Sequence, residues 1–396
     1  MDNLKINKLD LIILGITLES INIRTPIGHL SIALITILIT NLFLIFNLKK
    51  YNINSSRPLL IFALWISLIS VFQGNSLIGN LVRCYSLVYI GSIIPDLNLE
   101  NNKLVNSLRK ILTFHCFILY FDYLFVVPWG WDGEDLFRIG IFNNLNRATG
   151  LFLEPSYFGL TINLILLLLV ISKQVKKIDF ILVIVAGYCC SSLSAVLGTV
   201  LIIISHYLRF FLRILKNIFI NRKIIRIKRK YFIYPFLFVL LISLNFNKRD
   251  IGSRLRNPYY DSSSLSRIFG SYFTFKNIIK NSPIYGYGLG GDNIDNILNS
   301  FGATFTLDQI GGSEVITQHS GNRIFKLSLV NIFVVLTFIG GVPLLLLFNY
   351  YLLNSFGISI YLFIFIILSF FTGSIWNVIY FLTPSISKLL INNNKE

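Results

Sequence analysis

Two charged residues that could take part in a reaction lie where the chain enters a long apolar run. The segment "RATGLFLEPSYFG", residues 147–159, carries Arg147 and Glu154 seven positions apart and runs into "LTINLILLLLVIS". An arginine binds phosphate oxygens through its planar fork, and a carboxylate can accept a hydroxyl proton. Gly150 favours a turn, and Pro155 suits the first turn of a helix. We therefore expect an anionic group and a reacting hydroxyl to be held beside the apolar run.

Further basic residues and one histidine are candidates for the same chemistry. Group transfer from a phosphate ester to a hydroxyl needs positive charge beside the leaving phosphate, to stabilise it, and an acceptor for the hydroxyl proton. For phosphate contact we expect Arg147, Arg267 and Arg323, with Arg254 and Arg256 as secondary candidates. For the base, Glu154 and His319 remain alternatives. An unperturbed histidine has a pKa of about 6.5, whereas Glu154 has a second role available as a helix-capping residue.

The composition places these residues in a polytopic membrane protein. Of the 396 residues, 54% are hydrophobic and only 13% are charged, and the mean hydropathy is +0.70. These values are too apolar for a soluble domain of this length. Apolar runs of membrane-helix length predict an all-α fold with about twelve transmembrane helices. The runs cover residues 10–23, 29–47, 58–73, 78–94, 108–128, 157–172, 178–190, 193–211, 231–246, 326–350, 356–373 and 376–391.

The basic residues predict how these helices are oriented. The net charge of +17 comes from lysines and arginines gathered between apolar runs, which fits the positive-inside rule better than a nucleic-acid site. We expect 213–230 to be a basic cytoplasmic loop, with both termini on the same side. The chain, 1–396, is then a single membrane domain with two outer connections, 129–156 and a large loop, 247–325. This orientation requires 178–212 to form two short helices rather than one.

Other motifs predict neither a cofactor nor a metal. The four cysteines lie in or beside apolar runs, with the spacing of neither a disulfide framework nor a zinc site. "GYGLGG", residues 286–291, lacks the strand and helix of a nucleotide-binding loop and is interpreted as a turn. The acids of "WGWDGEDLF", residues 129–137, are interpreted as a solvated loop rather than a cation site. Within apolar runs, Glu19, Arg83 and Asp122 are interpreted as structural ion-pair partners rather than catalytic residues.

Four motifs between residues 140 and 345 form an ordered set. They read "RATGLFLEPSYFG", "SSLSAVLGTVLIII", "SRIFGSYFTFKNIIKNSPIYGYGLGG" and "HSGNRIFKLSLVNIFVVLTFIGG". The set resembles the O-antigen and capsular polysaccharide polymerases (the Wzy family), polytopic proteins similar to the O-antigen ligases. The second motif departs from that pattern by lacking an arginine. In the fourth, Gly340 follows His319 by 21 residues with no acidic residue between them, which favours a polymerase over a ligase.

The resemblance implies glycosyl transfer at the outer face of a bacterial cytoplasmic membrane. The substrate would be undecaprenyl-pyrophosphate-linked oligosaccharide repeat units, which the family joins into O-antigen or capsule without a metal or another cofactor. A chain-length regulator and a flippase of the same pathway would be partners, and no nucleic acid would be. Glycan transfer to another acceptor by a ligase is the nearest alternative. A repeat-unit flippase is less favoured, because the outward charge gathers in two loops rather than along a central cavity.

Overall fold

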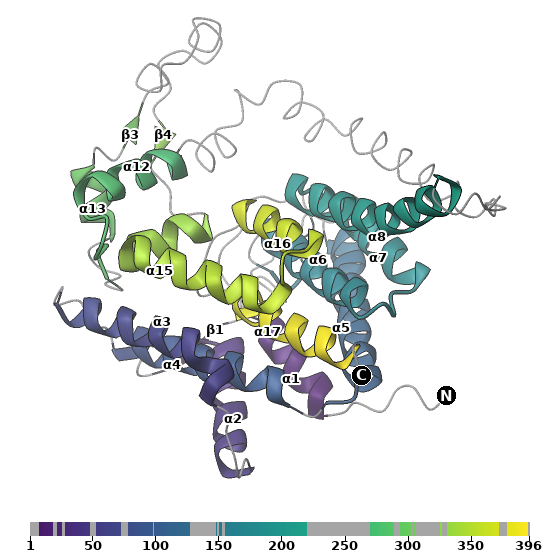
Figure 1. Ribbon diagram of the computed structural model, residues 1–396, viewed down its shortest axis with the longest axis horizontal. Coiled ribbons are helices and arrows are strands. Elements are labelled where there is room, and N and C mark those ends of the chain that lie inside the picture. The colour runs from purple at the N-terminus through teal and green to yellow at the C-terminus, as the bar shows by residue number, and fades with distance from the viewer. Residues whose placement is uncertain are drawn as a thin grey trace, which may run out of the picture. The chain divides into compact units, whose positions relative to one another are not determined.

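The computed structural model describes a set of helices and several short segments between them (Figure 1). The described residues are 8–18, 22–25, 28–47, 53–72, 78–97, 99–126, 148, 150–152, 155–219, 270–288, 294–301, 304–305, 325–326, 331–371 and 378–394. The predicted span 231–246 lies outside these ranges, as does most of the two predicted outer connections.

Helices make up most of the described residues, which confirms the helical class predicted from composition. In the first half they are α1 Lys8–Thr17, α2 Ile32–Asn47, α3 Ile53–Phe72, α4 Ile78–Ile93, α5 Asn101–Phe121, α6 Pro155–Ile171, α7 Lys177–Cys190 and α8 Leu193–Phe219. In the second half they are α12 Ser271–Asn281, α13 Ile294–Ser300, α15 Ile332–Phe356, α16 Ile360–Phe371 and α17 Val378–Asn393. A 3₁₀ turn, Ile94–Asp96 (η2), follows α4, and a π-helical turn, Asp122–Val126 (η3), follows α5.

Two short antiparallel ribbons interrupt the helices. Strand β1, Asn22–Thr25, pairs with β2, Gly28–Ser31, and β3, Thr304–Phe305, pairs with β4, Phe325–Lys326. The first ribbon corrects the predicted span 10–23, because α1 ends at Thr17 and the chain then pairs with itself. The β-branched residues of "NIRT" fit such a strand better than a helix end.

Among the described helices, one has both the length and the apolar composition to cross a membrane. It is α15, with a mean hydropathy of 2.4 over its most apolar window. Shorter apolar stretches occur at Ile32–Leu42, Pro58–Phe72, Leu81–Ile93, Pro155–Ile171, Ser194–Tyr207 and Ile360–Ser369. The twelve spans and their orientation therefore stay predictions.

Contacts between Cα atoms divide the chain into two compact units. Unit 1 comprises Met1–Ile13, Glu100–Gly252 and Ser359–Phe365, and unit 2 comprises Leu14–Leu99, Ser253–Ile358 and Ile366–Glu396. The predicted single domain thus contains two contact units, and each is described by itself.

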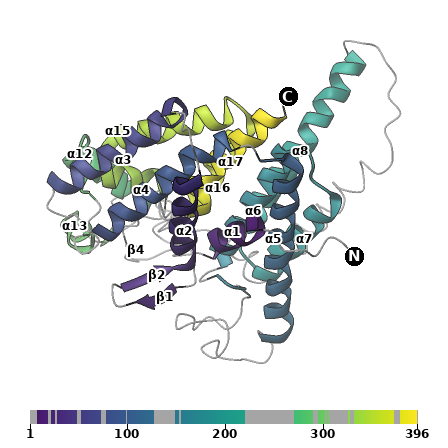
Figure 2. The same cartoon turned by 90° about the horizontal axis from the view of Figure 1, so that it is seen from below.

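In unit 1, helix α6 packs against α5, α7 and α8 (Figure 2). Its side chains are buried almost without exception from Ser156 to Ile171. Gly159 lies so close to Ala195 of α8 that an added Cβ would lie 2.9 Å from the Ala195 Cα. Nearby, the Asn163 amide donates to the Ala195 carbonyl at 3.0 Å, and the Thr199 hydroxyl donates to Asn163 Oδ1 at 2.8 Å. The α6–α8 contact therefore combines close packing with satisfied buried polar groups.

Helices α7 and α8 form a helical hairpin, as the predicted orientation requires. Ser191 ends α7 in the left-handed conformation (φ 48°), and α8 begins at Leu193. Phe180 near the start of α7 contacts His206 of α8, with ring centroids 5.3 Å apart, so the helices run antiparallel. The prediction of two helices within 178–212 is confirmed. Helix α8 continues to Phe219, so residues 213–219 of the predicted basic loop are helical.

One end of unit 1 carries two ion pairs in which only the aspartates are buried. Arg109 of α5 donates to Asp179 of α7 at 3.0 Å and to the Gln174 carbonyl at 2.7 Å. Lys110 of α5 donates to Asp10 of α1 at 2.8 Å. The start of α5, the segment after α6 and the start of α7 therefore lie at the same end of this unit.

In unit 2, helix α15 packs against α3 and α17, and α3 also packs against α4 (Figure 1). Phe62, Phe348 and Phe381 form an aromatic cluster with ring centroids 5.8–6.4 Å apart. The Tyr351 hydroxyl lies 2.6 Å from that of Ser385, so α15 and α17 also share a buried polar contact.

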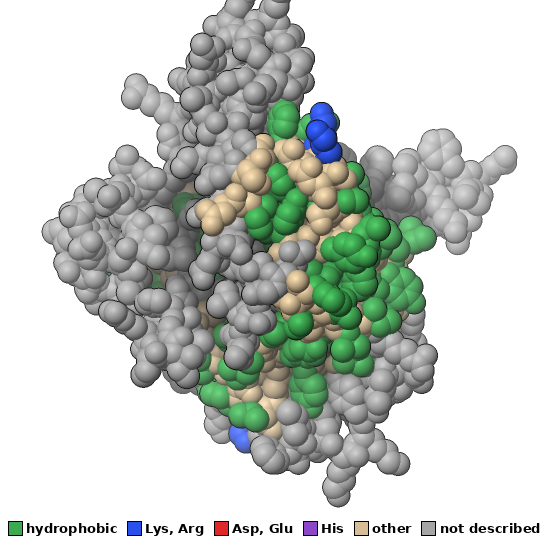
Figure 3. All heavy atoms as spheres, turned by 90° about the vertical axis from the view of Figure 1, so that its left-hand side faces the viewer, with side chains coloured by type: hydrophobic (Ala, Val, Ile, Leu, Met, Phe, Trp, Pro, Cys, Tyr) green, Lys and Arg blue, Asp and Glu red, His purple; other side chains and the backbone are tan. Residues whose placement is uncertain are grey.

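Much of the described surface is apolar. Figure 3 views one face, where hydrophobic side chains cover most of the described area and no acidic side chain of a described residue is visible. Helix α3 exposes Ile61, Leu64, Leu68 and Phe72 at helical spacing, and Phe72 is 82% exposed. The opposite positions, such as Phe62 and Ile66, are buried. A helix that is apolar on all sides is typical of a membrane span or a deeply buried core helix.

Candidate functional site

All predicted site residues lie outside the part of the chain that the structure describes. They are Arg147, Glu154, Arg254, Arg256, Arg267, His319 and Arg323. How these residues lie relative to one another therefore stays a prediction. The structure does describe segments beside them in sequence: residues 148 and 150–152, residues 270–288 and the start of α15.

The described part of the first motif is fixed against the C-terminal end of α5 in unit 1. Ala148 is fully buried, and Gly150 adopts φ 59° beside Leu119. The Phe152 ring lies between those of His115 and Phe158, with centroid distances of 5.2 and 5.6 Å. The predicted turn at Gly150 is confirmed. The turn therefore rests on a packed surface rather than extending as a free loop.

A carboxylate from η3 binds the same turn. The Gly150 N–H donates to Asp122 Oδ2 at 2.9 Å, and Asp122 is 7% exposed. Sequence reasoning assigned Asp122 to a structural ion pair, because neither spacing nor periodicity connects residues 122 and 150. The only available signal was an acidic residue near the end of an apolar run, just before a predicted outer connection.

Helix α6 begins directly after the motif's glutamate. Pro155 is its first residue, as the sequence predicted. Glu154 and Arg147 themselves lie outside the described residues, so capping and base chemistry for Glu154 both stay predictions.

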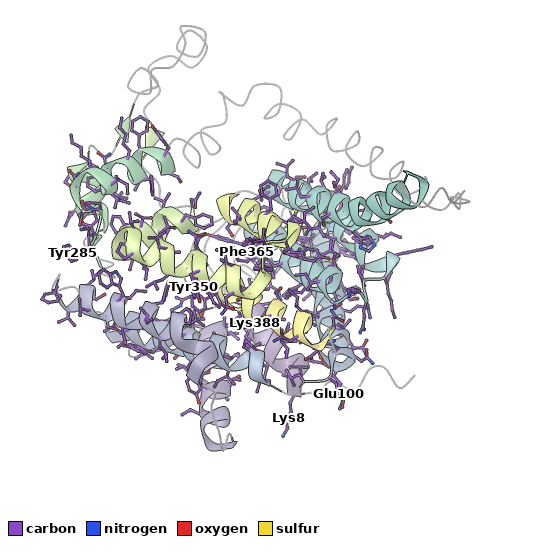
Figure 4. The ribbon with its side chains drawn as sticks, in the orientation of Figure 1. Lys8, Glu100, Tyr285, Tyr350, Phe365 and Lys388 are labelled. Atoms are coloured by element: carbon purple, nitrogen blue, oxygen red, sulfur yellow. The ribbon has the colours of Figure 1, made fainter. Side chains whose placement is uncertain are left out.

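The third motif contributes an amphipathic helix and a glycine turn in unit 2. Helix α12 buries Ser271, Thr274 and Ile278, which share one face at helical spacing, and it packs against α15. A turn over residues 283–285 follows, so the chain turns just before the predicted position, 286–291, of which only 286–288 are described. Tyr285 at this turn is more than half exposed and lies at the edge of the view in Figure 4.

This turn inserts into a break in α15. Gly340 and Gly341 have non-helical backbone angles and divide the helix into two parts. The N–H groups of Tyr287 and Gly288 donate to the Phe338 and Ile339 carbonyls at 2.6 and 2.9 Å. In return, the Val342 N–H donates to the Pro283 carbonyl at 2.8 Å. The turn thus replaces intrahelical hydrogen bonds that the break removes.

Only glycine fits at the two points of closest approach. Gly286 has φ 62°, and an added Cβ would lie 2.6 Å from the Phe338 carbonyl oxygen. Gly341 has φ 67°, and its Cβ would overlap the Ile284 carbonyl. Both backbones therefore approach each other more closely than any side chain would allow.

Trp65 of α3 also binds the backbone at this break. Its indole N–H donates to the Gly340 carbonyl at 2.8 Å, which joins α3 to the break. Gly340 lies eight residues after Ile332, or about 12 Å along the helix axis. This part of the predicted large loop therefore lies about two turns along α15 from its start.

Residues 306–324, which include His319 and Arg323, have described residues on both sides in sequence. On those sides, Thr304 pairs with Lys326 and Phe305 with Phe325. Asn331 caps α15 by accepting a hydrogen bond from the Phe333 N–H at 2.9 Å. These contacts join the two ends of residues 306–324.

The comparisons with known proteins add no family assignment. No protein-family model matches the chain, and no curated protein shows significant sequence similarity to it.

Proposed function

We propose that this chain polymerises polyprenyl-pyrophosphate-linked oligosaccharide repeat units into a surface polysaccharide at the outer face of the cytoplasmic membrane. It would be a multi-pass membrane protein of about twelve helices. The four ordered motifs carry the expected reaction, with Arg147, Arg267 and Arg323 at the pyrophosphate and Glu154 or His319 as base.

One observation supports this proposal most. The glycine turn at residues 283–288, from the third motif, inserts into the break of α15 within the fourth motif. Helix α15 has the length and composition of a membrane span. A substrate with a polyprenyl tail must present its pyrophosphate close to the membrane surface. The turn lies about two helical turns along this span from its start, so this part of the proposed loop would lie at a depth suited to such a substrate.

The charge distribution in unit 1 also supports the proposed orientation. The end of unit 1 with the two ion pairs also carries the basic residues Lys103, Arg109 and Lys110 of α5 and Lys176 before α7. The Asp122–Gly150 contact lies at the opposite end of α5. Basic residues facing the cytoplasm would therefore leave the first motif on the outer side.

The proposed reaction exchanges one bond at the anomeric carbon. The bond from this carbon to the pyrophosphate oxygen of the growing chain breaks, and a bond to a hydroxyl oxygen of the next lipid-linked unit forms. The hydroxyl proton passes to the base, and undecaprenyl pyrophosphate leaves with the electron pair. Arginines stabilise the developing phosphate charge, because their guanidinium groups stay protonated and bind two oxygens at once.

The experiment uses purified protein in liposomes supplied only with lipid-linked repeat units. A ladder of products with increasing numbers of repeats supports the polymerase. A single transfer product that appears only when another acceptor is added would favour the ligase. Translocation of units without any new glycosidic bond would favour the flippase.

A further inference from the structure

We infer that Asp122 is a positioning residue that holds the first motif in its working conformation. This inference rests on the proposed function. The carboxylate itself would not touch substrate. It would act through the Gly150 backbone, which stands three residues after Arg147 and four before Glu154.

The buried position of Asp122 is unfavourable for a carboxylate unless hydrogen-bond donors compensate for its charge. It directly follows α5 and is 7% exposed, and burial of a carboxylate without hydrogen-bond donors is costly. It also begins η3, and π-helical turns are rare and often occur at functional sites. Hydrogen bonding to N–H donors such as that of Gly150 compensates for burial of the charge.

The contact fixes the backbone of a turn that side-chain packing alone does not fix. Gly150 has φ 59°, a region that glycine enters and leaves at low cost. The bond from its N–H to Asp122 selects one orientation of this peptide group, and Phe152 packed on His115 holds the next residues. Arg147 stands three residues before Gly150 in the sequence, so we expect a change at Gly150 to alter where Arg147 lies.

Asp10 provides a matched control. It is also a buried aspartate bound to α5, through Ser107 and Lys110, but at the helix's other end. Substitution of either aspartate removes a buried carboxylate from unit 1. Only Asp122 contacts the first motif.

The functional arm compares Asp122→Ala, Asp122→Asn and Asp10→Ala at equal protein levels in liposomes. We expect Asp122→Ala to lower kcat by at least about tenfold, since small misplacements of reacting groups are costly. Asp122→Asn keeps an acceptor oxygen and should restore kcat to within about threefold of the unsubstituted protein. Asp10→Ala should leave kcat unchanged. Full activity of Asp122→Ala, or equal inactivity of Asp122→Asn, would overturn the inference.

A second arm does not depend on polymerase activity. In a background without the four native cysteines, Ala148→Cys reports on the motif, because Ala148 is fully buried. Maleimide labelling should be slow with Asp122 or Asp122→Asn and at least about tenfold faster with Asp122→Ala. Equal rates in all three would overturn the inference. Failure of the unsubstituted protein to polymerise, with this labelling pattern intact, would instead count against the proposed function.

Discussion

Single hydrogen bonds join the first motif to the end of α5 and the break in α15 to α3. Asp122 binds the Gly150 N–H in unit 1, and in unit 2 the Trp65 indole binds the Gly340 carbonyl. Both are polar contacts in apolar surroundings, where a buried polar group without a partner is costly. Substitutions that remove either donor or acceptor should therefore lower stability or activity even though they remove few atoms.

Removing the indole donor should weaken α15 at its break. Trp65→Phe leaves the Gly340 carbonyl without this donor, and we expect a loss of about 1–3 kcal/mol in the free energy of unfolding. Thermal unfolding of the purified protein in detergent measures the change. Tyr85→Phe is the control, because the Tyr85–Ser67 hydrogen bond is exposed and should contribute less than about 0.5 kcal/mol. Equal unfolding temperatures for both variants would contradict the proposed role of Trp65.

The arginines proposed to bind pyrophosphate should be essential for activity but not for folding. Arg147→Ala and Arg267→Ala should each lower the polymerisation rate by about 100-fold or more, because each removes charge stabilisation of the leaving group. Membrane content of each variant, measured by immunoblot, should stay unchanged. Arg226→Ala in the basic segment is the matched control and should polymerise normally. Normal polymer in both test variants would remove the phosphate assignment.

Helix ends could be predicted from the sequence where a local signal marks them. Contacts between segments far apart in the chain could not be predicted. Pro155 marked the start of α6, and the serines after Cys190 marked the break before α8. The break in α15 was not predicted. Gly340, Gly341 and Pro343 are a local signal for a kink, but no local signal indicates the turn that occupies it, which lies more than fifty residues earlier in the chain. The Asp122–Gly150 contact was missed for the same reason. The charged candidates of the site stay predictions from sequence.

The close approach of α6 and α8 should tolerate no added methyl group. Gly159→Ala places a Cβ against Ala195, and we expect a loss of about 1–3 kcal/mol from overpacking. Gly187→Ala in α7 is the control, since its Cβ would lie 3.8 Å from Val196 Cγ2 at ordinary contact distance. It should be neutral or gain up to about 1 kcal/mol from helix propensity. Thermal unfolding in detergent compares the two, and equal destabilisation would contradict the packing described here.

The whole molecule has the composition of a membrane protein, and its two contact units each contain apolar helices. In the proposed topology, the motif segments face the outside and the basic segment 213–230 faces the cytoplasm. Ion pairs at the start of α5 and the Asp122 contact at its end give unit 1 two chemically different ends.

Labelling of intact cells tests this orientation. In a background without native cysteines, Ser313→Cys in the large loop should react with an impermeant maleimide, because this loop is predicted to lie outside. Asn221→Cys in the basic segment should react only after the membrane is permeabilised. The reverse pattern would invert the predicted topology and remove the proposed outer site.

The most direct measurement counts both products of the proposed reaction. Purified protein in liposomes receives lipid-linked repeat units, and undecaprenyl pyrophosphate release and glycosidic bonds are quantified together over time. Polymerisation predicts one undecaprenyl pyrophosphate released for each new bond between repeats, with no added metal or nucleotide sugar. Release without chain growth, or no reaction by protein that is folded and inserted, would contradict the account.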